Sequence, residues 1–114
     1  MWTERSGVGA FNGLTKLKVL SIEGNDIREI PTGTFENMNS LEYLGLMINR
    51  IEHLDSDVFG GLVNLKRVTL SGNLLQYLHP DTFLVLQKLQ NANLRNNPGL
   101  HVPTDRNFIN SHSL

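Results

Sequence analysis

Residues 41–64, LEYLGLMINRIEHLDSDVFGGLVN, contain the pattern that decides the fold of this chain. Moving the window back by 24 residues gives LKVLSIEGNDIREIPTGTFENMNS at 17–40. Moving it forward by 24 gives LKRVTLSGNLLQYLHPDTFLVLQK at 65–88, and neither step needs an insertion or a deletion. A period held this strictly indicates a solenoid, in which each repeat packs against its neighbours.

The repeat continues beyond these windows and divides the chain. We expect an irregular lead-in at 1–10, a partial repeat at 11–16, and full repeats at 17–40, 41–64, 65–88 and 89–113. Besides its leucine columns, the pattern has an asparagine column and a phenylalanine column. These columns are Asn25, Asn49, Asn73 and Asn97, and Phe35, Phe59 and Phe83. In the fourth repeat, Pro98 and Gly99 read as one residue added after the asparagine.

This spacing resembles the leucine-rich repeat, L-x-x-L-x-L-x-x-N-x-L, over nearly the whole chain. The 24-residue length with an L-x-x-x-x-F-x-x-L tail is similar to the animal extracellular subclass of Toll-like, Slit-like and insect secreted proteins. The resemblance implies an α/β repeat solenoid, a curved right-handed coil. Its parallel sheet would line the concave face, and irregular or 3₁₀ segments would form the convex face. It also implies a fragment of a longer array, because the subclass has caps that are not seen here.

The columns predict local structure. Residues 19–23 alternate as a half-buried strand does, and 43–47, 67–71 and 91–95 are equivalent, so we expect parallel strands about 4.8 Å apart. An asparagine side chain carries two donors and an acceptor. It can therefore satisfy the backbone of the turn after its own strand and of the neighbouring turn. We interpret the asparagine and phenylalanine columns as structural.

Function must then come from strand positions that the repeat leaves open. Tyr43, Met47 and Arg67 are neighbours on the concave face, and tyrosine, methionine and arginine are enriched at interface centres. We expect Met47 to be exposed and Gly45 to deepen the surface between them. The alternative is a solvated face of chance composition. The full candidate set for partner binding is Glu23, Tyr43, Met47, Arg67, Thr69, Asn91 and Arg95.

Acidic and histidine residues gather in the convex columns. The register stacks Arg28 over Glu52, and Asp55 beside His79, with Asp57 and Asp81 close by. A metal site or a proton-transfer pair is conceivable there, but we interpret the group as exposed ion pairs worth about 0–1 kcal/mol each. No nucleophile stands beside an oriented base, and there is no phosphate loop. We therefore expect no catalytic, cofactor or metal site and no enzyme activity.

Composition restricts the partners. A net charge of −1 without a basic run argues against nucleic acid, and no apolar stretch approaches the roughly 18 residues that span a bilayer. We expect a protein ligand or co-receptor, bound by a secreted or cell-surface receptor of immune type, with self-association through uncapped ends. The alternative is an intracellular leucine-rich repeat scaffold or adaptor, which the absence of cysteine also fits.

Overall fold

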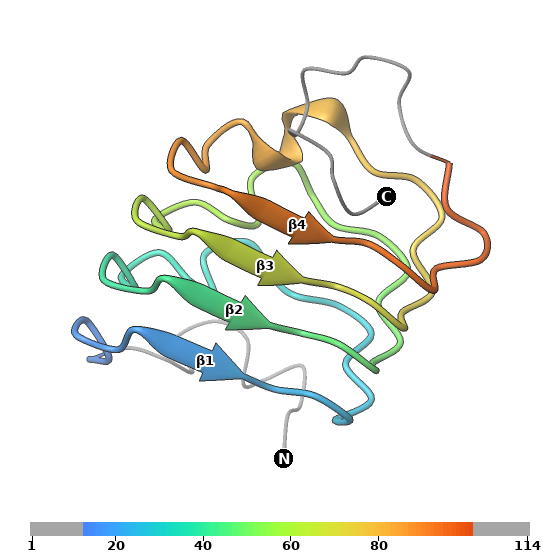
Figure 1. Cartoon of the computed structure of the whole chain (residues 1–114), viewed down its shortest axis with the longest axis horizontal. Coiled ribbons are helices and arrows are strands. Elements are labelled where there is room, and N and C mark those ends of the chain that lie inside the picture. Colours follow the sequence, from blue (N-terminus) through green and yellow to red (C-terminus); the bar gives the residue numbers. More distant parts are fainter. Residues whose placement is uncertain (1–12, 102–114) are drawn as a thin grey trace.

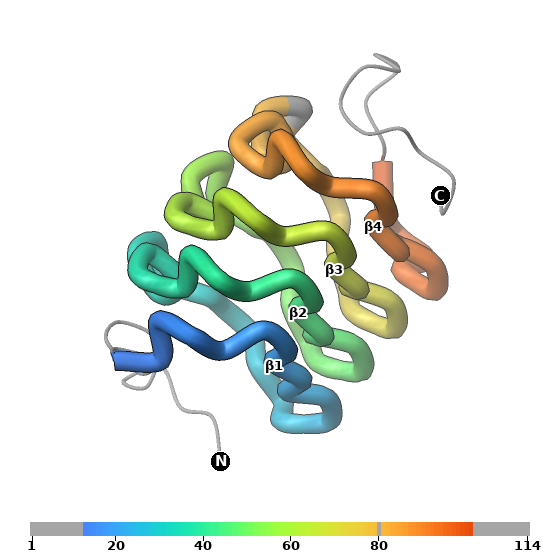
Figure 2. Tube along the Cα trace, turned by 60° about the vertical axis from the view of Figure 1, so that its left-hand side comes forward, coloured from blue at the N-terminus to red at the C-terminus, as the bar shows by residue number. Residues whose placement is uncertain are grey.

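The computed structural model describes residues 13–101, and these form one coil of stacked repeats. The elements are β1 (Val19–Ser21), β2 (Tyr43–Gly45), β3 (Arg67–Thr69), the 3₁₀ helix η1 (Pro80–Phe83) and β4 (Asn91–Asn93). The strands are parallel in the order β1-β2-β3-β4 and lie side by side in Figure 1. Figure 2 shows the corresponding coils stacked along the molecule. The expected leucine-rich repeat solenoid, with a parallel sheet on one face, is therefore confirmed.

The sheet register follows the sequence period. Val19 pairs with Tyr43 and Tyr43 with Arg67, each 24 residues apart. The strands are shorter than the five residues expected, since β1 ends at Ser21. Interstrand hydrogen bonding nevertheless continues, because the Ile22 amide donates to the Gly45 carbonyl at 2.8 Å. The strand geometry ends early because the chain enters its turn.

The core lies between the sheet and the return segments. The phenylalanine column is buried there as a stack, with ring centroids 6.4 Å apart for Phe35–Phe59 and 5.7 Å for Phe59–Phe83. On the return path, η1 begins with Pro80, and the His79 imidazole Nδ1 accepts from the Asp81 amide at 3.0 Å. A proline at the first position suits a helix start because its missing N–H would have no partner there.

The asparagine column forms a hydrogen-bonded spine between repeats. The Asn73 amide nitrogen donates to the carbonyls of Leu70, in its own repeat, and Leu46, in the preceding one, both at 2.9 Å. Its oxygen accepts from the Ile51 amide at 3.1 Å. Asn49 and Asn97 bond in the same way. Asn25 differs, because among the described residues its side chain donates only to the Glu23 carbonyl, at 3.0 Å.

In the fourth repeat, the 24-residue period continues past Pro98 and Gly99, where the sequence suggested an added residue. Tyr77 pairs with His101, again 24 residues apart. The prediction that Pro98 and Gly99 add a residue is therefore wrong as far as His101, since an added residue would have shifted the pairing register. The Leu100 amide instead donates to the Asn97 carbonyl at 3.0 Å, which closes the turn. Some expectations lie outside the described residues: the lead-in at 1–10, the start of the partial repeat at 11–12, residues 102–113 of the last repeat and the uncapped ends.

Candidate partner-binding surface

Tyr43 is the centre of the concave strand face. Its register neighbours are Val19, 61% exposed, and Arg67, also exposed. The Tyr43 ring is half-buried because it covers Gly45: a Cβ at Gly45 would lie 2.9 Å from the tyrosine Oη and 3.1 Å from the Ser21 Oγ. The expectation that Gly45 deepens the surface is therefore wrong. Gly45 is buried, and the space that it leaves is filled by the tyrosine.

The other concave candidates differ in accessibility. Met47 is half-buried and not exposed as expected, and Thr69 is buried with its Oγ1 3.2 Å from the Ser71 Oγ. Alternation assigns a side chain to a face but does not say how far its neighbours cover it, which is why both exposures were misjudged. Of the remaining candidates, Asn91 is half-buried, and Glu23 and Arg95 are exposed.

A second feature lies where the chain leaves the sheet. Each repeat has a positive φ at the same position of this turn: Gly24 (69°), Ile48 (57°), Gly72 (69°) and Asn96 (60°). The first repeat has a second positive φ at Asp26 (55°). Glycine and asparagine accept this conformation, whereas a β-branched residue is an outlier there. Strained residues of this kind cost of order 1–3 kcal/mol each. Ile48 is also 62% exposed, so burial of its side chain does not offset the strain.

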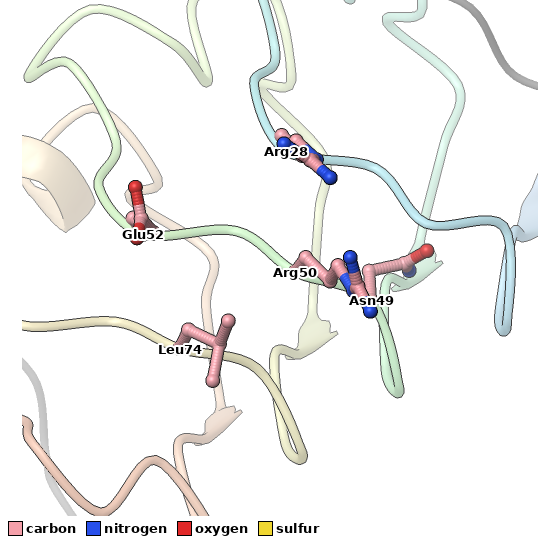
Figure 3. Close-up of a pocket in the computed structure, with 5 residues that line it drawn as sticks. All are labelled: Arg28, Asn49, Arg50, Glu52 and Leu74. Carbon is pink, nitrogen blue, oxygen red and sulfur yellow. The ribbon is translucent and has the colours of Figure 1, made fainter.

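Beside this turn is a pocket of about 500 Å³ that the sequence did not point to. Its five lining residues come from three successive repeats and are drawn in Figure 3. They are Arg28 from the first repeat, Asn49, Arg50 and Glu52 from the second, and Leu74 from the third. The only sequence signal was a leucine at the position that Asp26 and Arg50 occupy in earlier repeats. A pocket assembled from three repeats depends on side-chain directions that a column alignment does not give.

The contacts between histidine and carboxylate in the convex columns are not the ones the register suggested. Asp55 contacts His53 at 3.7 Å, and His79 contacts Asp81 at 3.9 Å, so each pair lies within one repeat. The expected Asp55–His79 pairing is therefore wrong. His53 and Asp55 are two apart in an extended segment and so point to the same side, whereas Asp81 lies in the first turn of η1, which His79 caps.

In the described part of the chain, the convex charges also do not gather into a larger cluster. Between 13 and 101 the structure has no ion pair joining Arg28 to Glu52, although both line the pocket. The described residues also hold no group of three or more histidine, cysteine and acidic side chains that could bind a metal. The arrangement can therefore present shape, apolar area and single charges to a partner.

The repeat geometry agrees with comparisons to known proteins. A family model described as leucine rich repeat matches residues 5–49 and 41–98. The chain belongs to the leucine-rich repeat family. A comparison with curated protein sequences finds no match.

Solved structures resemble this leucine-rich repeat chain closely. A chain of the Drosophila Toll–Spatzle complex is 32% identical with a TM-score of 0.77, over 84% of this chain and 13% of that one. A chain of the TLR13–ssRNA13 complex is 32% identical with a TM-score of 0.74, over 82% and 13%. Human 5T4, a trophoblast glycoprotein, is 30% identical with a TM-score of 0.66, over 78% and 34%. The chain thus spans a small part of the proteins that it resembles.

These neighbours connect the repeat with recognition in general, since two are receptor complexes named with a ligand. One ligand is the protein Spatzle and the other is single-stranded RNA. The comparisons therefore give no support to the expectation that nucleic acid is excluded as a partner. Within 13–101, no helix has the length and apolar character needed to cross a membrane.

Proposed function

We propose that this leucine-rich repeat segment recognises a protein ligand or co-receptor through its concave strand face. The observation that carries the proposal is the Tyr43 ring, held over Gly45 between the exposed side chains of Val19 and Arg67. An aromatic ring, an aliphatic side chain and a guanidinium thus stand in one row across three strands.

The physical argument is preorganisation. Tyrosine and arginine are enriched among the residues that dominate binding energy at interfaces. A ring already packed against the backbone loses little rotamer freedom when a partner covers it, so less of the contact energy is lost to ordering. The parallel strands beneath the ring hold its neighbours at fixed separations. Glu23, Met47, Thr69, Asn91 and Arg95 would form the surrounding contacts, with the buried Thr69 contributing least.

The setting that we propose is a secreted or cell-surface receptor of immune type. Support comes from the 24-residue repeat with its F-x-x-L tail and from the likeness to the Toll–Spatzle and TLR13–ssRNA13 structures. Enzyme activity is not part of the proposal, because the convex charges described between residues 13 and 101 pair locally.

The test is selection of a random peptide display library on the 114-residue chain, followed by affinity measurement of the selected peptides. Replacing Tyr43 by alanine and Arg67 by glutamate together should weaken binding by roughly 100-fold, the sum expected for two strong interface contacts. Lys16→Glu, an exposed charge reversal away from this row, is the matched control. Unchanged affinity of the Tyr43/Arg67 variant, with its fold intact by circular dichroism, would refute the concave-face proposal.

A further inference from the structure

The turn after the strands carries charged and apolar side chains that are not part of the proposed concave binding face. The pocket beside it is lined by the guanidinium groups of Arg28 and Arg50 against the single carboxylate of Glu52. Arg28 makes no ion pair within the described part of the chain. Arg50 contacts Asp26 at 3.7 Å, but both side chains are largely exposed, and such pairs open at little cost. The pocket therefore offers an incoming anion one arginine without an ion pair among the described residues, Arg28, and a second, Arg50, whose exposed pair with Asp26 the anion can replace.

Apolar side chains border these cations. Leu74, which lines the pocket, is 47% exposed, and Ile48 directly precedes the pocket residue Asn49. The Ile48 side chain leans toward the third repeat, where its Cγ1 would lie 3.5 Å from a Cβ at Gly72. Because Leu74 belongs to that same repeat, exposed aliphatic groups from two repeats flank the charged pocket.

The conformation of Ile48 indicates that the exposed aliphatic side chains beside the pocket are not a by-product of repeat packing. The equivalent turn residues are Gly24, Gly72 and Asn96, all suited to a positive φ. The repeat geometry thus does not require an isoleucine, and its exposure means that folding gains little from it. A strained backbone that the fold does not need is grounds for a hypothesis of function. A contact with a partner would give the exposed side chain its role.

From these observations we infer that the turn edge is a second binding site, for an acidic extended segment of a protein partner. In that segment a carboxylate enters the pocket between Arg28 and Arg50, and an adjoining aliphatic side chain packs on Leu74 and Ile48. A guanidinium fork matches a carboxylate with paired, charge-assisted hydrogen bonds. The pocket of about 500 Å³ is as large as those that hold small-molecule ligands, so it has room for a side-chain carboxylate. The site is separate from the Tyr43 row and does not depend on it.

The probe is the synthetic peptide acetyl-Gly-Leu-Glu-Leu-Gly-amide, titrated into the ¹⁵N-labelled full chain by NMR. We expect a Kd of roughly 0.1–1 mM, with amide shifts concentrated at Ile48, Asn49, Arg50 and Leu74. A matched peptide with glutamine in place of glutamate should bind at least roughly tenfold more weakly, because it cannot make the charge-assisted pair. A peptide with alanine in place of both leucines should lose affinity as well.

Variants of the chain separate this site from the concave face. Arg28→Glu with Arg50→Glu should weaken peptide binding by at least roughly tenfold, whereas Lys16→Glu, a charge reversal elsewhere, should not. Ile48→Gly should weaken binding by roughly threefold while raising Tm by a few degrees, since glycine relieves the positive φ. Because stability and affinity move in opposite directions, loss of folding cannot explain that result.

Several outcomes would overturn the inference. These are no binding of the acidic peptide at millimolar concentration, equal binding of the glutamine peptide, or shifts confined to the concave row around Tyr43. The last of these would leave the proposed concave site standing, so the two proposals fail independently. In the same way, Tyr43→Ala should leave binding of this peptide unchanged.

Discussion

Asn73 gives the sharpest test of what holds the repeats together. Its side chain is 2% exposed and bonds to backbone groups of two repeats. Replacement by alanine leaves the buried Ile51 amide, whose partner is the Asn73 oxygen, without an acceptor. The Leu46 and Leu70 carbonyls are less affected, because the neighbouring Asn49 and Asn97 amides also donate to them, at 3.0 Å each.

The magnitude follows from this inventory. An orphaned buried N–H costs about 1–3 kcal/mol, and each carbonyl that loses one of two hydrogen bonds loses about 0.5–1 kcal/mol. We therefore expect Asn73→Ala to reduce the free energy of unfolding by about 2–5 kcal/mol. At roughly 4 °C per kcal/mol for a domain of this size, Tm should fall by about 8–20 °C.

The same substitution at Asn25 is the matched control. Asn25 belongs to the same column, but within residues 13–101 its side chain makes a single hydrogen bond, to the carbonyl of Glu23 at the edge of the spine. Asn25→Ala should cost only about 0.5–1 kcal/mol. Urea unfolding followed by circular dichroism would measure both variants, with the m-value checking that the transition stays cooperative. Equal losses at Asn25 and Asn73 would refute the reasoning, because they would show that the shared backbone bonds do not set the cost.

The remaining predictions concern packing, backbone geometry and surface charge. Phe59→Ala should destabilise the chain by about 3–5 kcal/mol in urea unfolding, because it opens a cavity in the middle of the aromatic stack. Gly61→Ala should cost at least about 2 kcal/mol in the same assay, since φ is 96° and a Cβ would overlap the Glu36 backbone. Gly99→Ala, where a Cβ meets no atom within 4 Å, is its control and should change stability by less than about 0.5 kcal/mol. Asp55→Asn should move Tm by no more than about 2 °C, because it removes only an exposed pair; a larger fall would show a buried role.

The sequence predicts the architecture well because the repeat constrains each column through its neighbours. A leucine at 41, 44 or 46 is specified by the same core environment in every unit, so its position alone indicates its burial. The strand register follows in the same way, since a shift of one residue would turn the whole apolar set outward. The 24-residue period therefore predicts the fold, the sheet order and the location of the core.

The candidate site is predicted less well because it depends on side chains that no column constrains. Alternation placed Tyr43 on the concave face but gave no sign that its ring would cover Gly45. The pocket beside Arg28 and Leu74 joins three repeats through side-chain directions. The contacts of Asp55 and His79 likewise formed within a repeat where the register suggested pairing between repeats. In each case the deciding contact is local, whereas the sequence pattern reports on the repeat as a whole.

In the turn after each strand, residues that the fold explains can be distinguished from one that we assign to recognition. Gly24, Gly72 and Asn96 have residue types that suit a positive φ, so the turn alone accounts for them. Ile48 adopts the same φ against its own preference and leaves its side chain in solvent. A stack selected only for stability would place glycine or asparagine there, as the other three repeats do. The isoleucine therefore indicates that the turn of the second repeat has a requirement besides folding. This turn adjoins the pocket with two arginines.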